Sequence, residues 1–118
     1  MFRGIAVVSI PVPDLEAARR FYGETLGLGT PVYDLPEAGW IEFASGGRGG
    51  NVSVTTEGWE GPRGGATIVF DVADCAAAVE GLRARGVRCD DPQTFPGYVT
   101  FASFYDPFGN RLQMCSPA

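Results

Sequence analysis

The sequence contains few side chains that could carry out covalent or acid-base chemistry. It has no histidine and no lysine, because all nine basic residues are arginine. This composition excludes, within one chain, a histidine-activated nucleophile, a lysine Schiff base, a P-loop lysine and a histidine-ligated metal. The remaining candidates are Cys115 as a nucleophile and Glu42 as a proton acceptor.

Each of these candidates also has an ordinary structural interpretation. A cysteine in a strand is commonly a small apolar filler, and activation of Cys115 would need a helix N-terminus or an arginine such as Arg111. Glu42 could equally be an exposed carboxylate at a strand edge. Cys75 and Cys89 complete an odd set of cysteines without Cys-x-x-Cys spacing, so neither a disulfide framework nor a four-cysteine zinc site is expected.

Composition bounds the class of protein. Fourteen acidic and nine basic residues give a net charge of -5, which argues against a nucleic-acid partner, because phosphate contacts need clustered cations. No apolar run approaches the roughly 20 residues of a membrane-spanning helix, and residues 1–12 lack the pattern of a signal peptide. We therefore expect a cytoplasmic protein with one domain over residues 1–118 and no membrane partner.

The same pattern of apolar and polar residues occurs twice in the chain, at an offset of sixty residues. Asp14 and Asp74, for example, occupy equivalent positions in the two copies. Each copy predicts a strand, a helix that starts after its aspartate and ends before a glycine, and three further strands. The predicted helices cover residues 15–26 and 75–85. The predicted strands cover residues 5–12, 31–34, 40–44, 51–56, 66–72, 87–91, 99–104 and 111–116. The sequence thus predicts an α+β fold of two βαβββ modules, residues 1–56 and 66–118, joined by a linker over residues 57–65.

A glycine-rich stretch over residues 45–50 invites comparison with a phosphate-binding loop. Such a loop needs a strand before it and a helix N-terminus after it, whereas strands are predicted on both sides of this one. We interpret it as a hairpin connection.

Alternation along the predicted strands separates two faces. One face is apolar, with Val8, Ile10 and Val12 as its first members, and we expect the helices on it. The other face mixes small polar, aromatic and charged side chains, which suits a site for an organic ligand, although a solvent-facing surface could have the same composition. The predicted ligand-binding residues are Val7, Ser9, Trp40, Glu42, Ser53, Thr55, Thr67, Val69, Phe104, Gln113 and Cys115.

Two segments of the sequence resemble a known family. They are PVPDLEAARRFY at residues 11–22, followed by Leu-Gly-Leu at residues 26–28, and YDPFGNRLQ at residues 105–113. Together with the repeat, they resemble the vicinal oxygen chelate superfamily, which includes glyoxalase I, extradiol dioxygenases and the bleomycin and mitomycin resistance proteins. The resemblance implies strands that curl into a half-open cup, helices on its convex face, and a homodimer.

Metal-dependent members of that superfamily place one ligand on the first strand and one on the last strand of each module. In register, those positions here are Val7, Ser53, Thr67 and Gln113. The first three are not ordinary ligands of a divalent metal, and only Gln113 offers an amide oxygen. We therefore expect no metal and no other cofactor.

Two functions from different classes are compatible with these residues. The first is a metal-independent small-molecule binding protein, similar to the antibiotic-sequestering branch of the superfamily. Trp40 and Phe104 would stack on an aromatic ligand, and Glu42 and Asp71 would favour a cationic one. The second is a metal-independent isomerase, cyclase or lyase acting on a small organic metabolite, with Glu42 or Cys115 as the reacting group. We predict the binding protein.

Some aromatic residues permit an interpretation without a ligand. Trp40 could be a core filler beside a loop. In a third hypothesis the pocket has decayed and the domain only dimerises, with Trp59 in the linker as a subunit contact or as a cover for local apolar surface.

Overall fold

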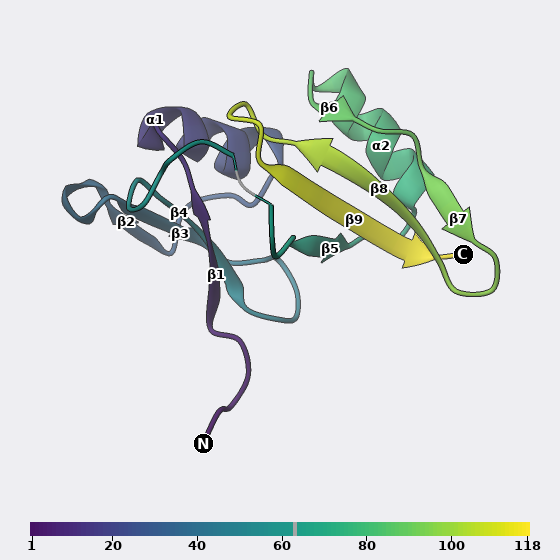
Figure 1. The fold of residues 1–118 in the computed structure, drawn as a ribbon, viewed down its shortest axis with the longest axis horizontal. Coiled ribbons are helices and arrows are strands. Elements are labelled where there is room, and N and C mark those ends of the chain that lie inside the picture. The colour runs from purple at the N-terminus through teal and green to yellow at the C-terminus, as the bar shows by residue number, and fades with distance from the viewer. Residues whose placement is uncertain (63) are drawn as a thin grey trace. The chain divides into compact units, whose positions relative to one another are not determined.

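A computed structural model describes residues 1–62 and 64–118 of the chain. Its contacts divide the chain into two compact units, unit 1 over Met1–Pro62 and unit 2 over Arg63–Ala118. Each unit contains a sheet and a helical segment (Figure 1). The boundary between the units falls inside the predicted linker, and the grouping of both units into one domain stays a prediction.

The sheet of unit 1 has the strand order β1-β4-β3-β2. Strand β1 (Val7–Pro11) pairs in parallel with β4 (Asn51–Thr55). Strand β3 (Trp40–Phe43) is antiparallel to β4 and to β2 (Tyr33–Leu35), with the short 3₁₀ turn η2 (Pro36–Ala38) between β2 and β3. A parallel pair needs a long crossover connection, and the helical segment after β1 belongs to that connection.

The sheet of unit 2 repeats this topology with the order β5-β9-β8-β6. Strand β5 (Val69–Asp71) is parallel to β9 (Arg111–Pro117). Strand β8 (Val99–Tyr105) is antiparallel to β9, to β6 (Arg88–Cys89) and to β7 (Gln93–Phe95). The predicted α+β class with two βαβββ modules is confirmed.

The strands of unit 2 differ from the prediction next to loops. The strand predicted over residues 87–91 ends at Cys89, and a separate strand, β7, begins after Pro92. Proline has no N–H to donate to a ladder, so the pairing is interrupted there. Strand β5 starts only at Val69, although the apolar alternation extends further towards the N-terminus.

The helical segment of unit 1 begins as predicted and then widens. The Asp14 carboxylate caps α1 (Leu15–Ala18) by accepting a hydrogen bond from Ala17 N–H at 3.2 Å. The segment continues as the π-helix η1 (Arg19–Thr25), where the predicted helix was a single α-helix. Near its end, a Cβ on Gly23 would lie 3.0 Å from the Gly29 carbonyl oxygen, so the close packing of this turn favours glycine.

Helix α2 (Cys75–Ala84) of unit 2 follows the prediction closely. The Asp74 carboxylate accepts a hydrogen bond from Ala77 N–H at 3.1 Å, and Gly86 follows the helix with a φ of 83°. Among the described residues, no helix is long and apolar enough to cross a bilayer.

Each sheet has one apolar face that is buried under its own helical segment. In unit 1 the buried residues from the sheet and helix are Ile10, Val12, Ala18, Phe21, Tyr22, Ile41, Phe43, Val52 and Val54. Val8 departs from the prediction, because it is 39% exposed. It lies on β1, the edge strand of this sheet, so one of its sides has no neighbouring strand within the unit.

The core of unit 2 is likewise formed by apolar side chains from the sheet and the helix. Its buried apolar residues are Cys75, Val79, Val87, Ala102, Phe104, Leu112 and Met114. The rings of Phe70 and Phe104 lie 6.3 Å apart between their centroids. Burial of these side chains supplies most of the stabilisation of the unit, at about 25 cal/mol per Å² of apolar surface.

Candidate functional site

The polar face of unit 1 is centred on a row of three side chains from adjacent strands. Ser9 on β1 pairs with Ser53 on β4, and Ser53 pairs with Glu42 on β3. The Ser9 and Ser53 hydroxyl oxygens lie 2.6 Å apart in a hydrogen bond. Ser53 is fully buried, Glu42 is half-buried and Ser9 is exposed. The structure therefore places these three predicted site residues together.

The Glu42 carboxylate is held by two neighbouring donors on the same face. The Trp40 indole N–H donates to Glu42 Oε1 at 3.1 Å, and the Asn51 side-chain amide donates to Oε2 at 2.8 Å. Both oxygens therefore have a fixed direction, and their remaining lone pairs can accept hydrogen bonds from another cationic or polar group. Asn51 was not among the predicted site residues.

The remaining predicted residues of unit 1 flank this row. Trp40 is half-buried and pairs with Thr55, so it is neither a fully buried filler nor a free surface ring. The Thr55 hydroxyl is engaged locally, because it accepts a hydrogen bond from Glu57 N–H at 3.0 Å. Val7 pairs with Asn51 at the other end of the face. The face thus offers an indole ring beside an oriented carboxylate.

The polar face of unit 2 has a different centre. Val69, Gln113 and Ser103 form the middle row across β5, β9 and β8. The Gln113 side-chain amide donates to Ser103 Oγ at 3.1 Å, and Val69 is 49% exposed. The structure brings the predicted residues Val69 and Gln113 together and adds Ser103 to them.

The predicted residue Cys115 lies on the same face of unit 2. Cys115 is half-buried, with Asp71 and Phe101 as its strand neighbours. Arg111 was the predicted activator of Cys115, but its guanidinium donates to Thr67 Oγ1 at 3.2 Å. This hydrogen bond of Arg111 therefore goes to Thr67 and not to Cys115.

The prediction for Phe104 is wrong, because this ring lies on the helix-facing side of the sheet. Phe104 pairs with Leu112 and is only 3% exposed, whereas Ser103 pairs with Gln113. Adjacent strand residues point to opposite faces, so Phe104 cannot share the face of Gln113. Phe101 does lie on that face, and it is the counterpart of Trp40 in unit 1.

A one-residue difference in loop length explains how sequence analysis missed Phe101. The strand registers pair Glu42 with Ser53 and Ser103 with Gln113, so β3 and β8 correspond at an offset of 61 residues. Ser53 and Gln113 on β4 and β9 correspond at an offset of 60 residues. The connection between β8 and β9 is therefore one residue shorter. Applying an offset of 61 upstream of this connection would have matched Trp40 with Phe101.

Two of the three cysteines are unsuited to nucleophilic chemistry. Burial raises the pKa of the Cys75 thiol above its ordinary value, and the nearby Cys115 adds to this effect. Burial likewise raises the pKa of Cys89, and the cationic Arg83 opposes that increase. A raised pKa keeps a thiol neutral, and the neutral form is a poor nucleophile. We therefore regard Cys75 and Cys89 as structural.

The four positions that correspond to metal ligands in metal-dependent relatives do not form a suitable donor set. The Val7 side chain offers no donor atom, and the Ser53 hydroxyl is bonded to Ser9. Thr67 Oγ1 already accepts from a guanidinium, which is a cation. Among the described residues, no three His, Cys, Asp or Glu side chains are grouped in a way that could hold a metal ion. These residues do not fit a divalent metal.

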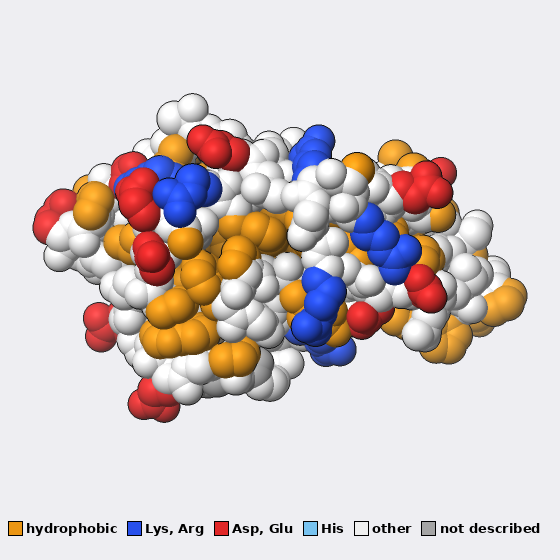
Figure 2. Space-filling view, turned by 90° about the horizontal axis from the view of Figure 1, so that it is seen from above, with side chains coloured by type: hydrophobic (Ala, Val, Ile, Leu, Met, Phe, Trp, Pro, Cys, Tyr) orange, Lys and Arg blue, Asp and Glu red, His pale blue; other side chains and the backbone are white. Residues whose placement is uncertain are grey.

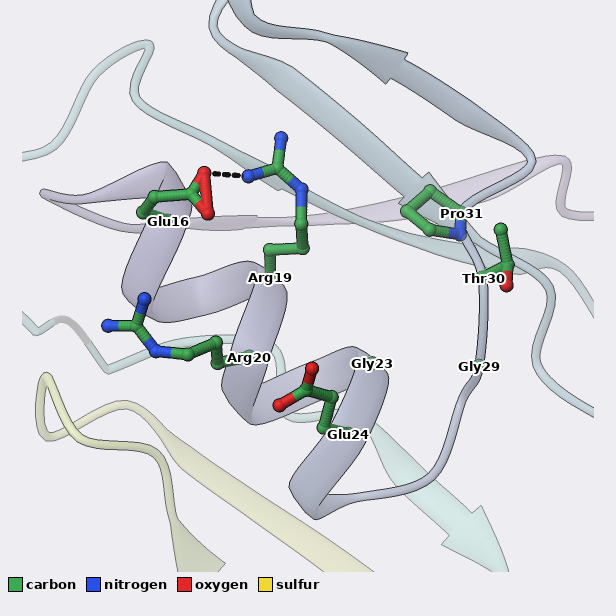
Figure 3. A pocket seen from close by; sticks show the side chains of 8 residues that line it. All are labelled: Glu16, Arg19, Arg20, Gly23, Glu24, Gly29, Thr30 and Pro31. Carbon is green, nitrogen blue, oxygen red and sulfur yellow. Dashed lines mark hydrogen bonds and ion pairs between the residues drawn. The ribbon is translucent and has the colours of Figure 1, made fainter.

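A hollow in unit 1 lies between the helical segment and residues 29–31. It is lined by Glu16, Arg19, Arg20, Gly23, Glu24, Gly29, Thr30 and Pro31 (Figure 3). Arg19 is engaged there, because its guanidinium pairs with Glu16 and with Asp34, the latter at 2.7 Å. These bonds raise the pKa of Arg19 further, the hydrogen bond to Asp34 being the larger cause. Figure 2 shows acidic and basic side chains next to one another over α1. Arg19 therefore has its charge balanced within the unit.

Comparison with known proteins extends these observations. A family model described as the Glyoxalase/Bleomycin resistance protein/Dioxygenase superfamily matches residues 4–114. No curated protein sequence matches the chain.

Solved structures resemble the chain over nearly its whole length. TnmS3, an antibiotic binding protein from Streptomyces sp. CB03234, is 28% identical with a TM-score of 0.84, covering 99% of this chain and 98% of that chain. A glyoxalase/bleomycin resistance protein from the same strain is 30% identical with a TM-score of 0.77, covering 94% and 98%. A member of the superfamily from Sphaerobacter thermophilus DSM 20745 is 24% identical with a TM-score of 0.82, covering 98% of both chains, a likeness of fold alone.

Proposed function

Because the chain belongs to the Glyoxalase/Bleomycin resistance protein/Dioxygenase superfamily, we propose that it is a metal-independent protein that binds an aromatic or cationic natural product. The observation that carries this proposal is the Glu42 carboxylate, which is fixed by Trp40 and Asn51 on the polar face of unit 1. An oriented carboxylate can pair with an ammonium or guanidinium group, while the adjacent indole offers a surface for stacking.

Two further observations support binding without a metal. The positions that correspond to metal ligands hold Val7, Ser53, Thr67 and Gln113, whose polar groups bond mainly to their neighbours. TnmS3, which has a very similar fold, is described as an antibiotic binding protein. A homodimer and a cytoplasmic location remain predictions that accompany this proposal.

The test is a titration of the purified chain with a panel of aromatic compounds that carry an amine, a guanidinium, a neutral amide or a carboxylate. Indole fluorescence reports binding, and Trp40→Phe distinguishes the signal of Trp40 from that of Trp59. We expect cationic aromatic compounds to quench Trp40. Glu42→Gln should weaken their binding about tenfold, as expected when an ion pair becomes a neutral hydrogen bond.

A matched variant and a metal determination make this test decisive. Glu24→Gln removes an equal charge from the helix-side hollow, and it should leave the affinity unchanged. Equal weakening by Glu24→Gln and Glu42→Gln would indicate a general charge effect and contradict the proposed site. Stoichiometric zinc, nickel or iron in tag-free protein would contradict metal independence. Conversion of a panel compound that is lost in Glu42→Gln would favour an enzyme.

A further inference from the structure

Three side chains of unit 2 form a cationic row at one end of its polar face. Arg111 on β9 pairs with Tyr105 on β8, and Tyr105 pairs with Arg88 on β6. Because directly paired residues point to the same face, Arg88, Tyr105 and Arg111 share this face of the sheet. The backbones of β9 and β6 are two strand spacings apart, roughly 10 Å. We call Arg88, Tyr105 and Arg111 the arginine row.

Each arginine of this row is oriented by a neutral partner. The Arg88 guanidinium carbon lies 3.8 Å from the centroid of the Tyr105 ring, which is a cation-π contact. The Tyr105 hydroxyl donates to Asp90 Oδ2 at 2.8 Å, which fixes the ring. Arg111 Nη2 donates to Thr67 Oγ1 at 3.2 Å. These contacts leave most N–H groups of both guanidinium groups available.

Neither arginine has an acidic partner among the residues that the structure describes. This distinguishes them from Arg19, which pairs with Glu16 and Asp34, and from Arg83, which pairs with Asp91 at 2.9 Å. The Asp90 carboxylate bonds to the tyrosine of the row and to neither guanidinium. In a chain with a net charge of -5, two neighbouring arginines without a carboxylate partner are an unbalanced positive site.

The same face continues along β8 with groups of a different kind. Two residues before Tyr105, Ser103 lies on the same face and accepts a hydrogen bond from the Gln113 side-chain amide. Two residues before Ser103, Phe101 lies on this face as well. The Phe101 ring stacks on Phe95, with centroids 5.8 Å apart and an interplanar angle of 16°. Successive residues on one face are about 7 Å apart, so the arginine row and the aromatic pair are separated by about 13 Å.

We propose that the arginine row binds the carboxylate of an aromatic organic acid whose ring lies along β8 towards Phe101. This proposal goes beyond the proposed function, because the arginine row lies on unit 2, whereas Glu42 lies on unit 1. Guanidinium groups bind carboxylates through two parallel hydrogen bonds, and the stack on Tyr105 holds one of them in place. Gln113 and Ser103 then face the middle of the ligand, where they can exchange hydrogen bonds with its polar groups.

The experiment is a low-salt NMR titration of the ¹⁵N-labelled full chain with 2-naphthoate, 2-naphthamide and inorganic phosphate. Low salt is required because exposed charges are screened over about 10 Å at 0.1 M salt. We expect 2-naphthoate to shift the amide signals of β8 and β9 and to bind about tenfold more tightly than the uncharged 2-naphthamide. Inorganic phosphate should bind more weakly than 2-naphthoate, because it makes no contact with Phe101.

Variants locate the effect. Arg111→Gln and Arg88→Gln should each weaken 2-naphthoate binding about tenfold and leave 2-naphthamide binding unchanged. Arg111→Lys, which keeps the charge but loses the paired N–H groups, should recover part of the affinity. Arg20→Gln in unit 1 removes an equal charge elsewhere and should have no effect. The dispersion of the NMR spectrum shows whether each variant is folded.

Three outcomes would overturn the proposal: equal affinity for 2-naphthoate and 2-naphthamide, equal weakening by Arg20→Gln, or phosphate binding as tight as that of 2-naphthoate. The last result would indicate a site for a bare anion. Failure here is distinguishable from failure of the proposed function, because a cationic aromatic compound that depends on Glu42 would still bind the wild-type chain.

Discussion

The two units share one topology and differ in the chemistry of their polar faces. Unit 1 has a buried serine, Ser53, at the centre of its face and an oriented carboxylate, Glu42, beside it. Unit 2 has a half-buried amide, Gln113, at the equivalent centre and two arginines at one end. The apolar faces are alike because burial under a helix imposes the same requirement on both. No such requirement acts on the polar faces, so their side chains can differ between the two units.

The largest effect on the free energy of unfolding is expected for two aromatic residues of β8, Phe101 and Phe104, which lie on opposite faces of the sheet of unit 2. Phe104→Ala should lower the free energy of unfolding by about 3–5 kcal/mol, because it empties a buried site. Phe101→Ala should lower it by only about 1–2 kcal/mol, because its ring is half-buried. Urea denaturation measures both values. A larger loss for Phe101→Ala would contradict the assigned register of β8.

Exchanging the central residues of the two faces tests how different the units are. Ser53→Gln should destabilise the protein by about 1–3 kcal/mol, because a larger side chain must enter a fully buried position. Gln113→Ser should cost about 0.5–1.5 kcal/mol, because it mainly removes the hydrogen bond to Ser103. Thermal or urea unfolding provides the comparison. Equal costs would mean that the two centres are packed alike.

The helix caps provide a comparison in which the units should behave alike. Asp14→Ala and Asp74→Ala should each lower the free energy of unfolding by about 1 kcal/mol, because each removes the acceptor for a first-turn N–H. The π-helical continuation in unit 1 lies beyond the first turn, so it should not alter this value. Asp14→Asn and Asp74→Asn keep an acceptor and should be nearly neutral. A much smaller effect at Asp14 would show that η1 weakens the start of its helix.

The smallest effect is a pH dependence confined to unit 2, which contains all three cysteines. Burial raises the pKa of Cys75 and Cys89, so their neutral thiols stabilise the fold below the ordinary thiol pKa of about 8.5. This contribution is lost as the pH rises through the raised pKa values. Stability should therefore fall slightly as the pH rises above the ordinary thiol pKa of about 8.5. The double variant Cys75→Ala, Cys89→Ser should show a flatter curve, and an unchanged curve would refute the assignment.

The sequence predicted the order of helices and strands correctly, but it assigned the side chains of β8 to the wrong faces. The Asp14 and Asp74 caps and the order of strands follow from local patterns, so they could be predicted. The extent of η1 could not, because apolar spacing does not distinguish α from π turns over so short a segment. Phe104 was assigned to the wrong face because the connection between β8 and β9 is one residue shorter than that between β3 and β4. A difference of one residue exchanges the two faces of the whole strand in the predicted alignment.

The candidate site shows a similar division. Glu42, Ser9 and Ser53 were predicted from alternation, and the structure places them in one row. Asn51 and Tyr105 were not predicted, because their importance comes from partners on other strands. Hydrogen bonds such as that from Asn51 to Glu42 depend on register, which one strand alone does not reveal.

By itself, the sequence determined that this protein has two βαβββ modules and that histidine and lysine side chains are absent. These properties depend on residue type, local alternation and capping, all of which are local. Only the tertiary structure decided which side chains meet: the carboxylate of Glu42 with Trp40 on its own strand and with Asn51 on the next one, and the guanidinium group of Arg88 with the Tyr105 ring. The physical reason is that strand pairing joins residues far apart in the chain, and a shift of one residue exchanges the two faces.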